Sequence, residues 1–310
     1  MITVGVQTKG LLPELPIEEA FDKIAKAGFT CIDLNLDAFL TSADVYKGNI
    51  NKFFDAPIED LLSYFGQYRQ AMDDRGIRAS QMHSVYPFLV PDRHQQNIYM
   101  QQVAIPKSIL IAEAMDIPWV VIHPCKLRYE FGVDREFEEN LKYYSSLIPF
   151  LKEHHVGICV ENLYTGIGPR TVEGPCANPQ EAIGYIDVLN EEAGEELFGL
   201  CLDTGHLQLV KREPYEYITT VGSRLKVLHL HENDVADDLH QMPFTFGRTE
   251  QDGLHWDNIA QALREIAFDG TLSYETHPCM RAFPASVQDV ALQTICMMGN
   301  QLKREIKMEK

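Results

Sequence analysis

Six short apolar segments of the chain each end in an ionisable residue. The runs are rich in β-branched residues, such as WVVI before His123 and GICV before Glu161. The complete set of terminal residues is His83, His123, Glu161, Asp203, His231 and Glu275. A charged side chain at the end of an apolar strand is costly unless it is paired or bound to a metal. Lys and Arg are scarce beside these ends, so the repetition favours a shared divalent cation.

The ligand types favour particular metals. Glu161, Asp203 and Glu275 offer three carboxylates, and His231 offers one imidazole. Because oxygen donors dominate, the set predicts one divalent ion, Mn²⁺ before Mg²⁺ or Co²⁺, with Zn²⁺ still open. His229 lies two residues before His231 and would face the same side of a strand. We select His231 because it lies nearer the end of the run.

Eight apolar runs alternate with eight segments of helical period. The expected strands are Thr3–Gln7, Cys31–Leu36, Ala79–His83, Trp119–His123, Gly157–Glu161, Gly199–Asp203, Val227–His231 and Thr271–Glu275. The expected helices are Ile17–Ala27, Ile58–Arg75, Ile98–Met115, Glu136–His154, Pro179–Asn190, Pro214–Val221, Trp256–Ile266 and Ser286–Ile306. This alternation predicts an α/β fold, a (β/α)8 TIM barrel that forms a single domain over residues 1–310. A doubly wound sheet is disfavoured because GVQTKG after the first strand is no dinucleotide-binding motif.

Composition disfavours several classes of protein. The 310 residues hold 27 Lys+Arg and 45 Asp+Glu, a formal net charge of −18, and no Lys/Arg cluster, so a nucleic-acid partner is disfavoured. The seven cysteines are scattered without a CxxC pair, which disfavours disulfides and zinc knuckles. No apolar stretch is long enough to span a membrane. The start MITVGVQTKG is unlike a secretory signal, so we expect a cytoplasmic protein.

The ordered motifs resemble the xylose isomerase-like TIM barrel superfamily of sugar phosphate isomerases and epimerases. The resemblance rests on His83, His123, Glu161-Asn162, Asp203-Thr204-Gly205-His206, His231-Glu-Asn-Asp234 and Glu275-Thr276, and it covers essentially the whole chain. It implies that Glu161, Asp203, His231 and Glu275 hold the metal. It also implies that His206 contacts substrate or a further metal. The superfamily includes inosose dehydratase and the endonuclease IV nucleases.

One departure from the family pattern leaves a second activity open. Ketose 3-epimerases carry an Arg six residues after the metal-binding His, where this chain has Asp237. Asp238-Leu239-His240 follows, which resembles the Asp-x-His of endonuclease IV. With it the chain could match all nine ligands of a trinuclear zinc nuclease. The loop ENDVADDLHQMPF is acidic and would repel phosphates.

These residues predict proton abstraction next to a sugar carbonyl. A divalent cation would stabilise the enediolate, and Glu161 and Glu275 would remove and return the proton. The expected activity is that of a sugar isomerase or epimerase. A lyase or dehydratase of a keto sugar or inosose stays open, including a C-glycoside-cleaving subunit with His123 or His240 as the extra acid or base. An abasic-site nuclease and a non-catalytic sugar-binding subunit are further alternatives.

The expected ligand is a small sugar or sugar derivative. We assign His83, His123, His206, Asp238 and His240 to substrate binding. The aromatic side chains Phe88, Tyr129, Tyr164 and Phe246 lie on expected loops above the strand ends and are candidates for an apolar wall beside the substrate. Barrels of this family commonly form homo-oligomers, and some C-glycoside-cleaving relatives act with a small partner subunit.

Overall fold

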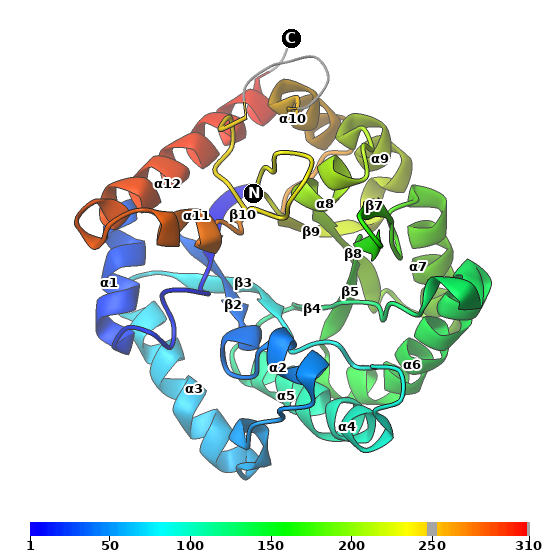
Figure 1. The fold of residues 1–310 in the computed structure, drawn as a ribbon. Coiled ribbons are helices and arrows are strands. Elements are labelled where there is room, and N and C mark those ends of the chain that lie inside the picture. Colours follow the sequence, from blue (N-terminus) through cyan, green and yellow to red (C-terminus); the bar gives the residue numbers. More distant parts are fainter. Residues whose placement is uncertain (247–252, 309–310) are drawn as a thin grey trace.

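Eight parallel strands form the closed barrel that the alternation of runs predicts (Figure 1). The computed structural model describes residues 1–246 and 253–308. The hydrogen-bonded order is β10-β1-β2-β3-β4-β5-β8-β9, and a parallel bridge between Leu230 and Tyr274 joins β9 to β10. The barrel strands are β1 (Thr3–Gln7), β2 (Cys31–Asn35), β3 (Arg78–His83), β4 (Trp119–Ile122), β5 (Gly157–Glu161), β8 (Phe198–Asp203), β9 (Leu225–His229) and β10 (Thr271–Tyr274). The chain thus forms a single TIM-barrel domain, as predicted.

The helices surround the barrel (Figure 1), and the longer ones carry buried apolar residues. In α1 these residues are Ala20, Phe21, Ile24 and Ala27, and Gly28 ends the helix in the left-handed conformation. The longer helices are α1 (Ile17–Ala27), α3 (Ile58–Asp73), α5 (Ile105–Ala114), α6 (Gly132–His154), α7 (Pro179–Ala193), α9 (Pro214–Val221), α10 (Trp256–Glu265) and α12 (Ala285–Lys307). The short helices are α2 (Ser42–Lys47), α4 (His94–Tyr99), α8 (Thr204–Leu209) and α11 (His277–Ala282).

Several predicted boundaries move by a few residues. Strand β9 ends at His229 rather than His231, and β10 ends at Tyr274 rather than Glu275. The helix expected over 98–115 begins at His94 and passes through a π-helical turn at Met100–Ala104 before α5. The segment Tyr164–Asn178, expected as a loop, contains an antiparallel hairpin of β6 (Tyr164–Ile167) and β7 (Arg170–Glu173). The expected loop 232–253 includes residues 247–252, which lie outside the described residues.

The interior of the barrel changes from apolar to ionisable along the strands. Buried Val121, Cys159, Cys201 and Val227 form one small cluster of four neighbouring strands. Successive side chains of a strand alternate between its two faces, so residues two positions later face the same interior. Those residues are His123, Glu161, Asp203 and His229. The strand period therefore carries four ionisable side chains into the barrel at the carboxyl ends of the strands.

The cysteines and the helices bear on the expectations about disulfides and membrane spans. All seven cysteines are buried and free, so no disulfide forms among them. Within residues 1–246 and 253–308, no helix combines the length and the apolar character that crossing a membrane requires.

Two partly buried acids hold the segment between β4 and α6 and the segment between β7 and α7. Glu136 on α6 accepts a hydrogen bond from the Leu127 backbone N–H at 2.5 Å, and Glu181 on α7 accepts one from Cys176 N–H at 3.2 Å. The other Glu181 carboxylate oxygen, Oε1, is buried without a partner among the described residues. Burial raises the pKa of Glu181 to about 7, and repulsion by Glu136 adds to the rise.

We expect Glu181→Gln to stabilise the protein above neutral pH. The folded-state pKa lies above the unfolded value of about 4.3, so the wild type loses stability as pH rises through about 7. At pH 8 the free energy of unfolding of the variant should be about 1–3 kcal/mol higher than that of the wild type. This difference should vanish near pH 4. Urea unfolding of both proteins across this range measures the difference. The exposed Glu191→Gln change in the same helix is the control, and a pH-independent gain would contradict the assignment.

Candidate metal centre

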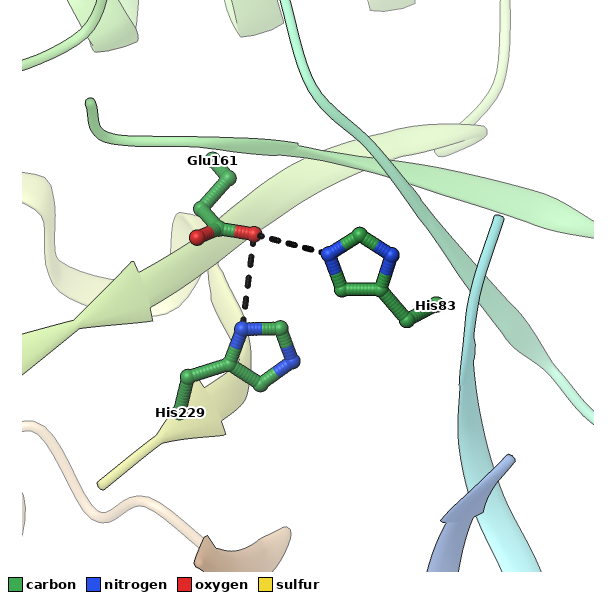
Figure 2. A group of neighbouring side chains, drawn as sticks. All are labelled: His83, Glu161 and His229. Carbon is green, nitrogen blue, oxygen red and sulfur yellow. Dashed lines mark ion pairs between the residues drawn. The ribbon is translucent and has the colours of Figure 1, made fainter. Parts of the chain in front are cut away.

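One side of the centre is built around the carboxylate of Glu161. Its Oε2 lies 3.0 Å from His123 Nε2 and 3.8 Å from His83 Nε2. The two histidine rings approach each other at 3.0 Å between their Nε2 atoms. Figure 2 shows the same carboxylate oxygen between the imidazoles of His83 and His229. All of these side chains except that of His123 are almost fully buried.

His229 lies between the two glutamates. Its Nδ1 is 3.3 Å from Glu161 Oε2 and 3.1 Å from Glu275 Oε2. On the opposite side of the ring, Nε2 lies 2.9 Å from Asp33 Oδ2. Since a carboxylate only accepts, this ring nitrogen carries the proton and donates to Asp33. Asp33 therefore fixes the orientation of an imidazole that faces two carboxylates from β5 and the end of β10.

Asp203 connects the centre to His231. Its Oδ2 lies 2.8 Å from His231 Nε2, and its Oδ1 accepts the His206 backbone N–H at 2.6 Å, which caps α8. Gly205 is required by this arrangement, because a Cβ there would lie 2.0 Å from His231 Cε1. The glycine of the DTGH motif thus makes room for the imidazole.

The loop after β9 supplies the other side of the centre. Asp238 lies 3.6 Å from His206 Nε2 and 3.4 Å from His240 Nδ1. The His240 ring stacks on His231 with 4.0 Å between centroids, and its Nε2 lies 3.6 Å from Glu275 Oε1. Asn233 holds the loop, since its Oδ1 accepts the backbone N–H groups of Leu239 and His240. The loop therefore places His240 beside His231 and Glu275, which lie at the ends of the barrel strands.

The donor atoms fit a divalent cation. Four triads of carboxylate and imidazole atoms lie within 4.8 Å of one another: His83–Glu161–His229, Asp203–His231–His240, Glu161–Asp203–His206 and Asp203–His229–Glu275. Asp203 belongs to three of them. Buried atoms without a hydrogen-bond partner among the described residues are also present, among them Glu161 Oε2, His229 Nδ1 and His231 Nδ1. Buried polar groups of this kind call for a partner, and a cation would satisfy oxygen and nitrogen together.

The electrostatics also favour positive charge at the centre. Burial by itself would raise the pKa of Glu161, but His123 and His229 hold it well below its usual range. His229 and His240 do the same for Glu275 against a similar effect of burial. Burial would lower the pKa of His206, yet the carboxylates of Asp203 and Asp238 raise it to about 10. Glu161 and Glu275 are therefore ionised and attract positive charge into the barrel.

All nine residues singled out from the sequence belong to this network. They are His83, His123, Glu161, Asp203, His206, His231, Asp238, His240 and Glu275. Sequence reasoning underrated His229 and missed Asp33. Both stand at inward-facing positions of β2 and β9, so the strand period places them inside the barrel, but it does not distinguish His229 from His231.

The expected aromatic wall is only partly present. Tyr164 borders the centre, with its ring 5.2 Å from that of His206. Phe88 was wrongly assigned to the wall: it is fully buried and stacks on Tyr143 at 4.1 Å, so it belongs to the core. Tyr129 is 75% exposed, and Phe246 lines a separate cavity beside Trp256. The sequence marks these residues as loop aromatics, but packing decides where each ring lies.

Comparison with known proteins places the chain in a family. The family model described as xylose isomerase-like TIM barrel matches residues 21–291. A curated relative, the uncharacterized protein y4fM of Sinorhizobium fredii, is 25% identical over 284 residues, covering 84% of this chain and 81% of the relative.

Solved structures share the fold at low identity. A 3-keto-D-glucoside 4-epimerase from E. coli has a TM-score of 0.68 at 12% identity, covering 97% of this chain and 100% of that one. A D-psicose 3-epimerase from Clostridium cellulolyticum H10 has a TM-score of 0.65 at 14% identity, covering 97% and 99%. At these identities the likeness extends to the fold alone. On the match of the family model over most of its length, the chain belongs to the xylose isomerase-like TIM barrel family.

Proposed function

We propose that this protein is a divalent-metal-dependent sugar isomerase or epimerase. It would abstract a proton next to the carbonyl of a keto sugar. The observation that carries the proposal is the approach of two carboxylates, Glu161 and Glu275, to the same nitrogen of His229, at 3.3 and 3.1 Å. Sugar epimerases among the structures of the same fold support the substrate class.

Glu161, Asp203, His231 and Glu275 would hold the cation. Asp203 shares a triad with each of the other three, which supports this set. The excess of oxygen over nitrogen donors favours Mn²⁺, with Mg²⁺, Co²⁺ and Zn²⁺ as alternatives. When bound, the cation supplies Lewis-acid stabilisation of negative charge on the sugar oxygens.

The two glutamates would carry the proton. One ionised carboxylate takes the C–H proton, and the electron pair of that bond moves into the enediolate. Return of a proton to the other face of the same carbon gives the epimer, and return to the neighbouring carbon gives the isomer. His229, fixed by Asp33, would keep both carboxylates oriented. The polar groups of His83, His123, His206, Asp238 and His240 would bind the sugar hydroxyls.

Elimination from the same enediolate is the alternative outcome. The chain has Asp237 where ketose 3-epimerases carry Arg. Loss of a β-substituent needs an acid at the leaving oxygen, and His123 or His240 borders the glutamates at 3.0 and 3.6 Å. A lyase or dehydratase activity would therefore use the same first step.

Hydrogen exchange tests the first step directly. We expect Mn²⁺-loaded enzyme in D₂O to introduce deuterium next to the carbonyl of at least one sugar in a panel of D-psicose, D-tagatose, a 3-keto-glucoside and an inosose, followed by NMR. Glu161→Gln and Glu275→Gln should each slow exchange by about 100-fold or more, since general acid–base catalysis contributes at least that factor. The exposed Glu153→Gln is the control. Absence of exchange with the whole panel would exclude enediolate chemistry.

A second candidate function is phosphodiester cleavage at abasic DNA. It is favoured by the assembly of all nine ligand types that the resemblance to endonuclease IV demands. His83 and His123 meet Glu161, while His206 and His240 meet Asp238. The net charge of −18 opposes a nucleic-acid substrate.

Metal content separates the two functions. We expect one equivalent of Mn²⁺ per chain to restore sugar C–H exchange after chelation, measured by elemental analysis and titration. Glu275→Gln should lower this stoichiometry or affinity, whereas the exposed Asp187→Asn should not. Three tightly bound Zn²⁺ ions together with nicking of an abasic duplex would instead support the nuclease.

Asp33 should matter for metal affinity although it lies behind the centre. Residues that orient metal-site side chains typically contribute about 10- to 100-fold in affinity. We expect Asp33→Asn to weaken Mn²⁺ binding by about that factor, because the amide no longer fixes His229 between the glutamates. Calorimetric titration measures the affinity, and circular dichroism checks the fold. Unchanged affinity in a folded variant would remove Asp33 and His229 from the proposed site.

A further inference from the structure

Lys126 is a cation without an acidic partner beside the centre. It follows β4, three residues after His123, and is half-buried. Among residues 1–246 and 253–308, its ammonium forms no hydrogen bond or ion pair, and it lies over the face of Tyr164, 4.7 Å from the ring centroid. A half-buried ammonium gains from such a ring but still favours an anionic oxygen.

Three other basic side chains of the segments near these strand ends are paired with acids. Lys9 contacts Asp37 at 2.5 Å, and Arg128, two residues after Lys126, contacts Asp92 at 2.9 Å. Arg212 contacts Glu173 at 2.7 Å. Lys126 differs from these three residues because no carboxylate pairs with its ammonium among the described residues.

Tyr164 links Lys126 to the metal centre. The tyrosine lies on β6 of the hairpin, its hydroxyl is 3.5 Å from Asp238 Oδ2, and its ring is 5.2 Å from His206. One aromatic side chain thus separates the ammonium from the nine-residue network. The ammonium therefore lies beside the part of the network that contains His206 and Asp238.

Asp238 is the nearest acid on this path, and it is already engaged. Its Oδ1 accepts a hydrogen bond from Asn233 Nδ2 at 3.2 Å and lies 3.4 Å from His240 Nδ1. Its Oδ2 lies near Tyr164 and His206. Burial lowers the pKa of Lys126, while attraction by Asp238 and Glu161 offsets part of that effect. These acids favour the protonated form of Lys126 without forming an ion pair with it.

We propose that Lys126, supported by the ring of Tyr164, binds an anionic group of the sugar, a phosphate or a carboxylate, remote from the carbon whose proton is removed. This inference rests on the proposed function, because it assigns the substrate of that site to the anionic keto sugars. The flexible lysine stem allows the ammonium to follow such a group. The cation would then select the substrate without taking part in proton transfer.

Binding to matched sugars tests the proposal. The probes are D-fructose, D-fructose 6-phosphate and D-fructuronate, titrated calorimetrically into the full-length Mn²⁺-loaded protein. We expect the wild type to bind at least one anionic probe about 10- to 100-fold more tightly than the neutral sugar, as one charge-assisted hydrogen bond allows. Lys126→Met should abolish this preference and leave affinity for D-fructose unchanged, and Lys126→Arg should retain it. Arg128→Met, in the same segment, is the control.

The outcomes separate this inference from the proposed function. Preference for only one of the two anionic probes supports the proposal and identifies phosphate or carboxylate as the group. Equal or weaker binding of both anionic probes, or a preference that survives in Lys126→Met, would overturn it. Loss of preference in Lys126→Met with no C–H exchange would retain the anion site and reject the enzyme chemistry. C–H exchange on neutral sugars alone, unaffected by Lys126→Met, would retain the enzyme chemistry and reject the anion site.

Discussion

The structure depends on gathering several carboxylates inside one barrel without their mutual repulsion opening it. Glu161, Asp203 and Glu275 come from separate strands and are buried or nearly so. Like charges at such separations repel strongly where water is excluded. Here imidazoles lie between the acids, His229 most closely of all. A cation at the same place would neutralise the remaining negative charge of the carboxylates. Folding and metal binding would then depend on the same groups.

The fold and the main acids could be predicted because both follow from strand geometry. An inward-facing residue at the end of each strand must reach the same space, whatever the helices outside do. The choice between His229 and His231 could not be made this way, since residues two apart share a face. The choice depends on where each strand ends. Strand β9 ends at His229, whose ring contacts Asp33. A contact across 196 residues of chain leaves no local sequence signal.

The segments above the strands were the least predictable part. Tyr164 and Phe88 are both aromatic residues on connections, yet one borders the centre and the other is core. The hairpin of β6 and β7 carries Tyr164 to His206, and its strands are too short and too polar for the apolar pattern used to find strands. Tertiary contacts decide such positions, so the residues on the connections are harder to predict than the acids at the strand ends.

This division suggests how one barrel could serve several sugars under the proposed function. The strand ends present the acids, which would then perform the same proton transfer on any suitably placed keto sugar. What holds the rest of the molecule comes from the connections, where Lys126 and Tyr164 lie on different segments. In a chain of net charge −18, an ammonium beside the acids that has no ion pair among the described residues produces a large local contrast in potential. Such a contrast would give an anionic substituent one favourable position, and under the proposed function it would also orient the sugar above Glu161 and Glu275.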